Sequence, residues 1–547
     1  MSQKILILIL LLCIIALPFV FEKRSKDLIE RTEEKLVIIT IHNETIRYEF
    51  TRGFKEWYWK KTGKTVSIDW RVLGGSQEVF RYLNGQYANA FEVYWEKVLG
   101  KRWSEKLRDV FANPKIILSE HPKSDDERQL ARRAFLTSHV SSGIDIIFGG
   151  GELEAIEQAE MGNVVPSGIL ELHPEWFNDT SIPQIFGGTQ YWDSKGRWIG
   201  ITQSGFGIIF NREALAKLSY QGEPKQWMDL ADPIFFGEVA LADPTTSLTS
   251  NRIFDMMFQQ QVKNVIDEKS LDIQSLEQIQ EALNYGWKRS MQLIQRICAN
   301  ARYFTDSSTK PVLDVSAGNC ALGVAIDFYG LYQETSLRER NESNRFGFVF
   351  PKGGTAATPD VAAVLRGAPN PEVALAFMEY ILSLEGQKLW SFRVGEADGP
   401  VRYALHCTPI RKELYNPEYN EFRTNPTLNA YKDVGDFIYH AQWSTPIFKP
   451  LRFIIKVAFI DTHKELSKAW KAINDAQSQG RIEDAKEAIA VFENFDVFNY
   501  QSVISDLKPL LSSENALDVI KLQGNLINRF RKQYATAEHI AKGHKLL

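Results

Sequence analysis

The feature that most constrains the fold is an alternation of strand-like apolar runs with amphipathic helices along the first half of the chain. Residues 35–41 (KLVIITI) form such a run, and aromatic residues at helical spacing follow from Phe50 to Trp57. Residues 65–73 and 143–151 (GIDIIFGGG) repeat the unit, and each of these runs ends in a glycine-containing loop before a helix. Strands that alternate with helices predict a parallel α/β sheet with right-handed crossovers. Loops at the carboxyl ends of its strands would line a ligand crevice.

Three stretches of the second half are typical of strands that end at polar residues. They are WIGITQSGFGIIFN from Trp198, VALADPTTSLTS from Val239 and GNCALGVAIDFYGL from Gly318. The second stretch leads through a cluster of hydroxyls into a helix that we expect at residues 251–261. The start of such a helix presents free N–H groups and hydroxyls that suit an anion, although plain capping by Ser247, Thr249 or Ser250 is the alternative. The third stretch stops at Asp327, which suits a ligand site, although a core strand whose Asp caps a helix explains it equally well.

The N-terminus has the layout of a secretory signal or signal anchor. Lys4 precedes an unbroken apolar run from Ile5 to Phe21, and the charged residues 22–26 follow it. The run is near the lower limit for a membrane span, and no Ala-x-Ala site follows Ala16. We therefore expect export to the periplasm or cell surface, with an uncleaved anchor in the cytoplasmic membrane.

Composition and motifs exclude several classes of function. A net charge of −4 and a pI near 6.2 leave no basic footprint for nucleic acid, which is not an expected partner. The four cysteines have no zinc spacing, and no cofactor is expected. The chain has no GxSxG, HExxH or P-loop motif, and SSTK at Ser307 is flanked by Asp306 and Pro311, which predicts a turn. We therefore do not expect an enzyme.

The order of these pieces resembles the extracellular solute-binding proteins of ABC transporters, in the ferric-binding-protein-like type II group. The resemblance spans roughly residues 35–390 and rests on IITIHNETIRYEFTRGFKEWYWKKTG, VLGGS, DIIFGGGE, QSGFGIIFN, QWMDLADPIFFGEVALADPTTS, GVAIDFY and AAVLRGAPNPEVALAFMEYILSLEGQKLW. It implies two α/β lobes that close like a hinge on one solute and deliver it to a membrane permease.

This resemblance implies a division of the chain into four parts. They are a signal peptide or membrane anchor at 1–27, a first lobe at 35–165 and 350–400, a second lobe at 166–349, and a largely helical extension at 401–547. The extension makes the chain longer than a simple binding protein, and we expect its helices to pack on a lobe.

Carried over by position, the resemblance places twelve residues in the crevice. They are His42, Asn43, Gly75, Ser76, Gly149 and Gly150 from the first lobe and Ser204, Gly205, Thr246, Ser247, Asp327 and Tyr329 from the second. Asn43, Ser76 and Ser247 would stand at helix starts, which suits a small anionic or polyhydroxyl solute such as a phosphonate, a sugar phosphate or an organic acid.

Two alternatives stay open at this point. Ferric members of the group usually place two consecutive tyrosines where this chain has Phe328 and Tyr329, so a metal site would rely on His42, Asp327 and Tyr329 as hard ligands. A ligand-sensing protein that acts on a membrane sensor kinase would bind the same solute without feeding a permease.

Overall fold

The computed structural model describes residues 34–121, 123, 126–340, 343–512 and 516–544. The predicted signal or anchor at 1–27 lies outside these residues. Within the described part, no helix is both long enough and apolar enough to cross a bilayer.

The first lobe is built around a seven-stranded sheet in the order β14-β7-β13-β3-β1-β2, with β4 paired to β13. Its strands are β1 (Glu34–Thr40), β2 (Val66–Val72), β3 (Ile146–Gly151), β4 (Val164–Val165), β7 (Ile199–Ser204), β13 (Thr358–Leu365) and β14 (Thr408–Pro409). β1 pairs parallel with β2 and with β3, whereas β13 runs antiparallel to β3 and β7. The parallel arrangement predicted for the three N-terminal strands is confirmed.

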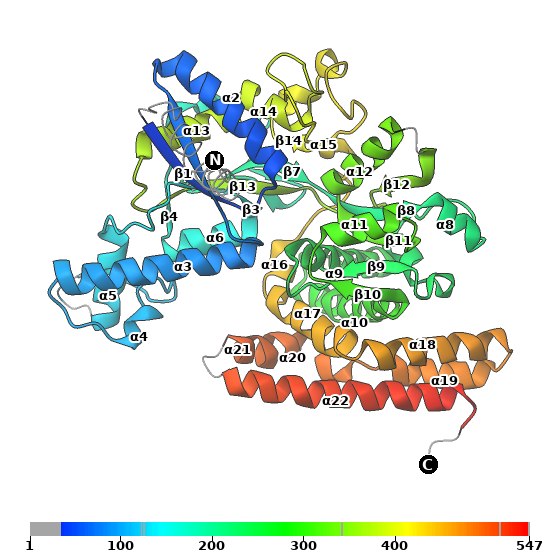
Figure 1. Ribbon diagram of the computed structural model, residues 1–547. Helices are drawn as coiled ribbons and strands as arrows, with labels where there is room; N and C mark the ends of the chain where they lie inside the picture. The colour runs from blue at the N-terminus through cyan, green and yellow to red at the C-terminus, as the bar shows by residue number, and fades with distance from the viewer. Residues whose placement is uncertain (1–33, 122, 124–125, 341–342, 513–515, 545–547) are drawn as a thin grey trace, which may run out of the picture.

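Helices cover both faces of this sheet (Figure 1). One core is shared with α2 (Glu44–Thr62), α13 (Pro371–Leu382) and α14 (Leu384–Ser391), and the other with α3 (Ser76–Val93), α5 (Glu127–Thr137) and α6 (Glu152–Met161). Leu36 and Ile38 of β1 enter the first core, while Val37 and Ile39 enter the second. This two-residue period explains why a strand buried on both sides is read as a continuous apolar run.

The second lobe has a five-stranded sheet in the order β10-β9-β11-β8-β12. Its strands are β8 (Phe206–Asn211), β9 (Val239–Ala242), β10 (Ala301–Thr305), β11 (Leu322–Ile326) and β12 (Phe346–Val349). Its helices are α9 (Leu248–Lys269), α10 (Leu276–Asn300), α11 (Thr309–Ser316) and α12 (Asp327–Glu339). α9 and α10 pack on each other and share the largest core of the lobe with its sheet, and α11 contributes to a separate small core.

Two of the connections between the lobes lie next to each other. β7 runs into β8 through Gly205, and residues 350–357 lead back from β12 to β13. The two connections touch, because a Cβ at Gly205 would lie 2.6 Å from the Phe350 ring. Two α/β lobes joined by adjacent crossing segments form the type II periplasmic-binding-protein fold, as predicted.

The boundary between the lobes lies later in the chain than expected. Residues 166–204 were assigned to the second lobe, but Ile169, Tyr191 and Ile201 lie in the core of the first. The reason is that β7 pairs along its whole length with β13, and its last residue, Ser204, is opposite Thr358. The change of lobe therefore occurs at Gly205.

The extension divides between the lobes. Its first part completes the first lobe, because β14 pairs with β7 and the backbone N–H groups of residues 401–403 donate to the buried carboxylate of Glu49. From Phe437 onward the chain shares a core with α9 and α10. Its main helices are α16 (Ala441–Ser444), α17 (Phe448–Ile455), α18 (His463–Ser478), α19 (Ile482–Phe492) and α22 (Ala516–Ala541). The predicted single unit from 401 is thus corrected, since only its later part is a helical body (Figure 1).

The segment that joins the two parts of the extension is a third connection between the lobes. Tyr431 packs against the core of the first lobe, and Phe437 and Tyr439 lie in that of the second. The Tyr439 N–H donates to the carbonyl of Gly187 at 2.7 Å, between β5 (Ile185–Phe186) and β6 (Thr189–Gln190) of the first lobe. We call residues 434–440 the third crossing.

Candidate ligand-binding crevice

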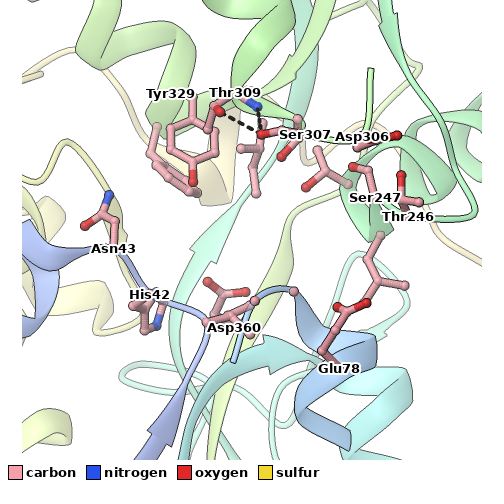
Figure 2. Close-up of a pocket in the computed structure, with 18 of the residues that line it drawn as sticks. His42, Asn43, Glu78, Thr246, Ser247, Asp306, Ser307, Thr309, Tyr329 and Asp360 are labelled. Carbon is pink, nitrogen blue, oxygen red and sulfur yellow. Dashed lines mark hydrogen bonds between the residues drawn. The ribbon is translucent and has the colours of Figure 1, made fainter. Parts of the chain in front are cut away.

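A cavity of about 610 Å³ lies between the two lobes, and we call it the crevice (Figure 2). The first lobe lines it with the segments that follow β1 and β2 and with Asp360 of β13. The second lobe lines it with the segments that follow β9, β10 and β11. The site therefore lies at the carboxyl ends of strands from both sheets, where α/β proteins bind ligands.

Five helices begin at the wall of the crevice. They are α2, α3, α9, α11 and α12, and residues at the start of each line the cavity. Asn43 caps α2 by accepting the Ile46 N–H at 3.1 Å, and Ser247 caps α9 by accepting the Ser250 N–H at 3.2 Å. The first turn of a helix leaves N–H groups without helical partners and carries a partial positive charge. The helix starts thus offer hydrogen-bond donors and a partial positive charge, although no positively charged side chain is among the described lining residues.

Acidic side chains supply the acceptors. Glu78, Asp306 and Asp360 line the crevice, and no Lys or Arg is among its described lining residues. Burial raises the pKa of Asp360 to about 7, and the charges of Asp327 and Glu152 act in the same direction. A carboxylate accepts hydrogen bonds from hydroxyls, so the crevice combines donors at helix starts with acceptors on side chains.

Among the residues predicted in the first lobe, His42, Asn43 and Gly75 line the crevice. Burial lowers the pKa of His42 to about 3, so its imidazole is neutral, and its Nε2 has no hydrogen-bond partner. Gly149 lies under this ring with a φ of 97°, and a Cβ there would be 2.7 Å from Nε2. Gly149 therefore leaves space for the His42 ring and does not line the crevice.

The two other predicted positions of this lobe are placed as follows. Gly150 lines a smaller cavity of about 90 Å³, which we call the inner compartment. Ser76 is the first residue of α3, directly after Gly75.

Of the residues predicted for the second lobe, Thr246, Ser247 and Tyr329 line the crevice. Ser204 lines the inner compartment and, as the last residue of β7, belongs to the first lobe. Burial raises the pKa of Tyr329 to about 12, so its phenol is protonated at neutral pH. The positions of Thr246, Ser247 and Tyr329 agree with the expected arrangement, and whether they contact a solute stays a prediction.

Asp327 and Gly205 are placed differently from the prediction. The Asp327 carboxylate is buried and accepts the Gly205 N–H at 2.9 Å and the Phe328 N–H at 2.7 Å. It anchors the crossing segment, because the helix start that carries it turns its side chain toward Gly205. The proposed metal set of His42, Asp327 and Tyr329 is therefore not assembled, and the described residues contain no cluster of three His, Cys, Asp or Glu suited to a metal.

Sequence reasoning assigned no binding role to Ser307, Ser308 and Thr309, which line the second lobe's side of the crevice. The Ser307 hydroxyl lies 2.8 Å from that of Thr309 and accepts the Thr309 N–H. The expected turn is wrong from Thr309 onward, because α11 begins there and Lys310 pairs with Asp314 on the same helix. The signal was available, since this hydroxyl cluster directly follows the strand-like residues 301–305.

Two α/β lobes, adjacent crossing segments and a crevice lined by helix starts define a two-lobed solute-binding protein. Residues 142–406 match the family model described as bacterial extracellular solute-binding protein. The matched segment, slightly less than half of the chain, is thus similar to that family.

Curated relatives match smaller parts of this chain. An uncharacterized protein from Haemophilus influenzae is 26% identical over 248 residues, which are 45% of this chain and 60% of that protein. The phosphoglycerate transport regulatory protein PgtC from Salmonella typhimurium is 25% identical over 191 residues, which are 35% of this chain and 40% of PgtC. The matches thus cover 60% or less of each relative's length.

Solved structures show a distant overall likeness. AfuA from Actinobacillus pleuropneumoniae, with fructose-6-phosphate bound, aligns with a TM-score of 0.45 at 15% identity over 78% of this chain and 99% of its own. The apo ferric ion-binding protein A from Pasteurella haemolytica aligns with a TM-score of 0.46 at 13% identity over 77% of this chain and 96% of its own. These values carry no information about the solute of this chain.

Proposed function

We propose that this protein binds a small solute with an anionic group and hydroxyl groups, such as a sugar phosphate, a phosphonate or a hydroxylated organic acid. The convergence of five helix starts on the crevice carries this proposal. Each exposed helix start favours a nearby anion by about 0.3 to 1 kcal/mol, and the effect grows when the site is partly buried. The hydroxyls of Ser247 and Ser307–Thr309 add donors on the same wall.

The three acidic residues of the crevice suit the rest of such a solute. Glu78, Asp306 and Asp360 can accept hydrogen bonds from solute hydroxyls, whereas a solute made only of phosphate would be repelled by them. Because the wall belongs to both lobes, a bound solute favours the arrangement in which the lobes lie close together. We assign the protein to the capture step of an ABC importer, with delivery to a membrane permease.

A sensing role is the second candidate. The curated relative PgtC is named a transport regulatory protein. The helical body from Phe437 onward shares a core with the second lobe, so it moves with that lobe and offers a surface to another protein. In this role the protein would act on a membrane sensor kinase and not on a permease.

The binding proposal is tested by thermal unfolding and calorimetry on a chain that begins at Glu34. The panel contains fructose-6-phosphate, 3-phosphoglycerate, a phosphonate, citrate, glucose and Fe(III). A true solute at a hundred times its Kd stabilises the protein by about 2.7 kcal/mol and raises the midpoint by several degrees. A response to Fe(III) alone, or to none of the anions, would contradict the proposal.

Transport and sensing are separated in cells. In a strain that lacks this protein, the importer for the solute is expressed from a constitutive promoter. Uptake stays absent if the protein delivers the solute, and it returns if the protein only senses the solute.

A further inference from the structure

The inner compartment lies beside the crevice, and a positively charged side chain lines it. Both cavities are lined by Leu248, Thr249, Ile326 and Asp360, so a solute in the crevice has the inner compartment next to it. Arg252 lines the inner compartment and is the one Lys or Arg among the described lining residues of the two cavities.

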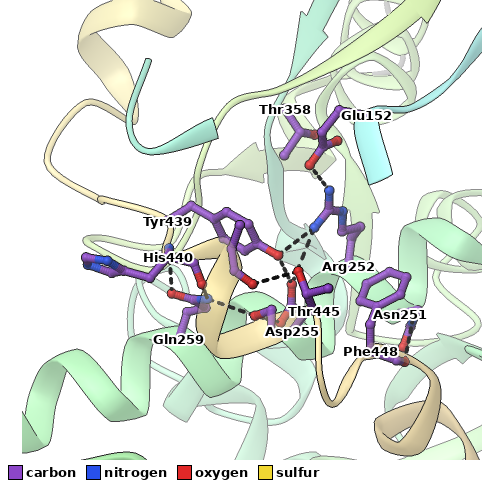
Figure 3. Close-up of polar contacts among 12 residues, drawn as sticks. Glu152, Asn251, Arg252, Asp255, Gln259, Thr358, Tyr439, His440, Thr445 and Phe448 are labelled. Atoms are coloured by element: carbon purple, nitrogen blue, oxygen red, sulfur yellow. Dashed lines mark hydrogen bonds and ion pairs between the residues drawn. The ribbon is translucent and has the colours of Figure 1, made fainter. Parts of the chain in front are cut away.

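Arg252 is held by residues from three parts of the chain (Figure 3). One of its terminal nitrogens donates to Glu152, which begins α6 of the first lobe. The other donates to the Tyr439 hydroxyl at 2.8 Å and lies 3.5 Å from Asp255. All four side chains are buried, with 8% or less of Arg252 exposed. The guanidinium also lies 5.3 Å from the centres of the Tyr439 and Phe448 rings.

The two acidic partners of Arg252 differ in how well they are satisfied. Asp255 has a partner for each oxygen, because it accepts from the hydroxyls of Tyr439 and Ser444. Glu152 uses one oxygen on Arg252, and its other oxygen is buried without a hydrogen-bond partner. A buried polar atom without a partner raises the free energy of the arrangement that contains it. Asp255 is therefore the permanent partner, and Glu152 is the partner that can be exchanged.

We propose that a carboxylate of the solute replaces Glu152 on Arg252 when the solute binds. This rests on the proposed function and narrows the solute to a carboxylic acid that also bears phosphate or hydroxyl groups. A carboxylate is the group that Glu152 already presents, and its two oxygens match the planar fork of a guanidinium. The phosphate or hydroxyl end then lies at the helix starts of the crevice.

The position of Arg252 supports this role. Tyr439 and Asp255 fix the guanidinium from behind, so it needs no reorganisation to receive a new carboxylate. Gly151, the N-cap of α6, and Leu248, the first residue of α9, line the same compartment, and these helix starts favour a negative group there. Glu152 comes from the opposite lobe, so its departure from Arg252 also removes a direct contact between the lobes.

The test compares two probes that differ only in the carboxylate, 3-phosphoglycerate and glycerol 3-phosphate, by calorimetry. The wild-type protein is expected to prefer 3-phosphoglycerate by about tenfold or more, as for a charge-assisted bidentate pair. Arg252→Gln should abolish this preference by weakening 3-phosphoglycerate alone, and Arg252→Lys should keep part of it. Glu152→Gln should strengthen the binding of 3-phosphoglycerate, because the competing carboxylate loses its charge.

The affinity for 3-phosphoglycerate is thus expected to fall in Arg252→Gln and to rise in Glu152→Gln. If the pair were only a structural salt bridge, both variants would bind both probes more weakly. Glu157→Gln is the matched control on α6. The half-exposed Glu157 carboxylate lies 3.8 Å from the Lys449 ammonium, and its ion pair is with Lys449 instead of Arg252. Equal affinities of the wild type for the two probes, or weaker binding in Glu152→Gln, would overturn the inference and leave the proposed function intact. If no anion of the panel binds to the wild type, the proposed function and the inference fail together.

Discussion

Two carboxyl groups, those of the buried Asp327 and the half-buried Asp360, lie beside the segments that join the lobes. Burial raises the pKa of each to about 7, and the charge of Asp327 adds to the effect on Asp360. The folded protein therefore favours the protonated form of each group more than the unfolded chain does. Their stabilising contribution is complete below the ordinary pKa of 3.8 and is lost as the pH rises through about 7.

Asp360→Asn should remove part of this pH dependence. The variant is expected to equal the wild type in stability near pH 4 and to exceed it at pH 8, because it has no buried charge to form. Urea unfolding between pH 4 and pH 8 measures the difference. Asp306→Asn is the control, since this exposed acid also lines the crevice, and an unchanged pH slope in Asp360→Asn would contradict the assignment.

Single residues were predictable where a local pattern determines them. Asn43 and Ser247 follow strands and precede helices, and both are N-caps at the crevice. Asp327 was misplaced because its side chain is directed by Gly205, which is 122 residues earlier in the chain. Glu152 and Arg252 were not recognised, because their pairing depends on how two lobes meet and leaves no signal near either residue.

At the scale of elements, the start of α9 combines a structural and a binding role. Ser247→Ala is expected to cost about 1 kcal/mol of stability through the lost cap. It should also weaken anion binding, because Ser247 lines the crevice. Chemical denaturation and calorimetry measure the two effects separately.

Ser275→Ala is a matched control for this variant. Ser275 caps α10 by accepting the Gln278 N–H and is not among the lining residues of the crevice. It should lose similar stability and keep full affinity. Equal affinities in the two variants would show that Ser247 serves only the helix.

Strands and helices of the first half were predicted nearly in place, because each has its own hydrophobic period. The expected strand at residues 35–41 corresponds to β1, and the one at 65–73 corresponds to β2. Membership in a lobe was less predictable. β7 is assigned by its partner β13, which follows more than 150 residues later, and no local pattern records that pairing.

At the scale of the whole molecule, the helical body beyond Phe437 is part of the second lobe. The Gln295 side chain of α10 donates to the Phe492 carbonyl at 2.8 Å, and the Trp287 ring donates to the Phe498 carbonyl. A chain that ends at Thr462 leaves these buried groups without partners and exposes their apolar neighbours. We expect it to lose cooperative urea unfolding and its near-ultraviolet circular dichroism.

A chain that ends at Ala541 is the control, because it removes only the residues beyond α22. It should unfold like the full chain. A sharp transition at an unchanged midpoint in the shorter variant would show that the second lobe folds without the helical body. The sequence predicted helices there that pack on a lobe, but not that their core would be continuous with that of α9 and α10.

The common core of the second lobe and the helical body gives the molecule a long arm. α22 alone has 26 residues and extends for about 39 Å at 1.5 Å per residue. If the lobes rotate around the crossing segments, the helical body moves with the second lobe, and its points farthest from the axis move most. A rearrangement of a few atoms around the solute would thus become a displacement large enough for another protein to detect.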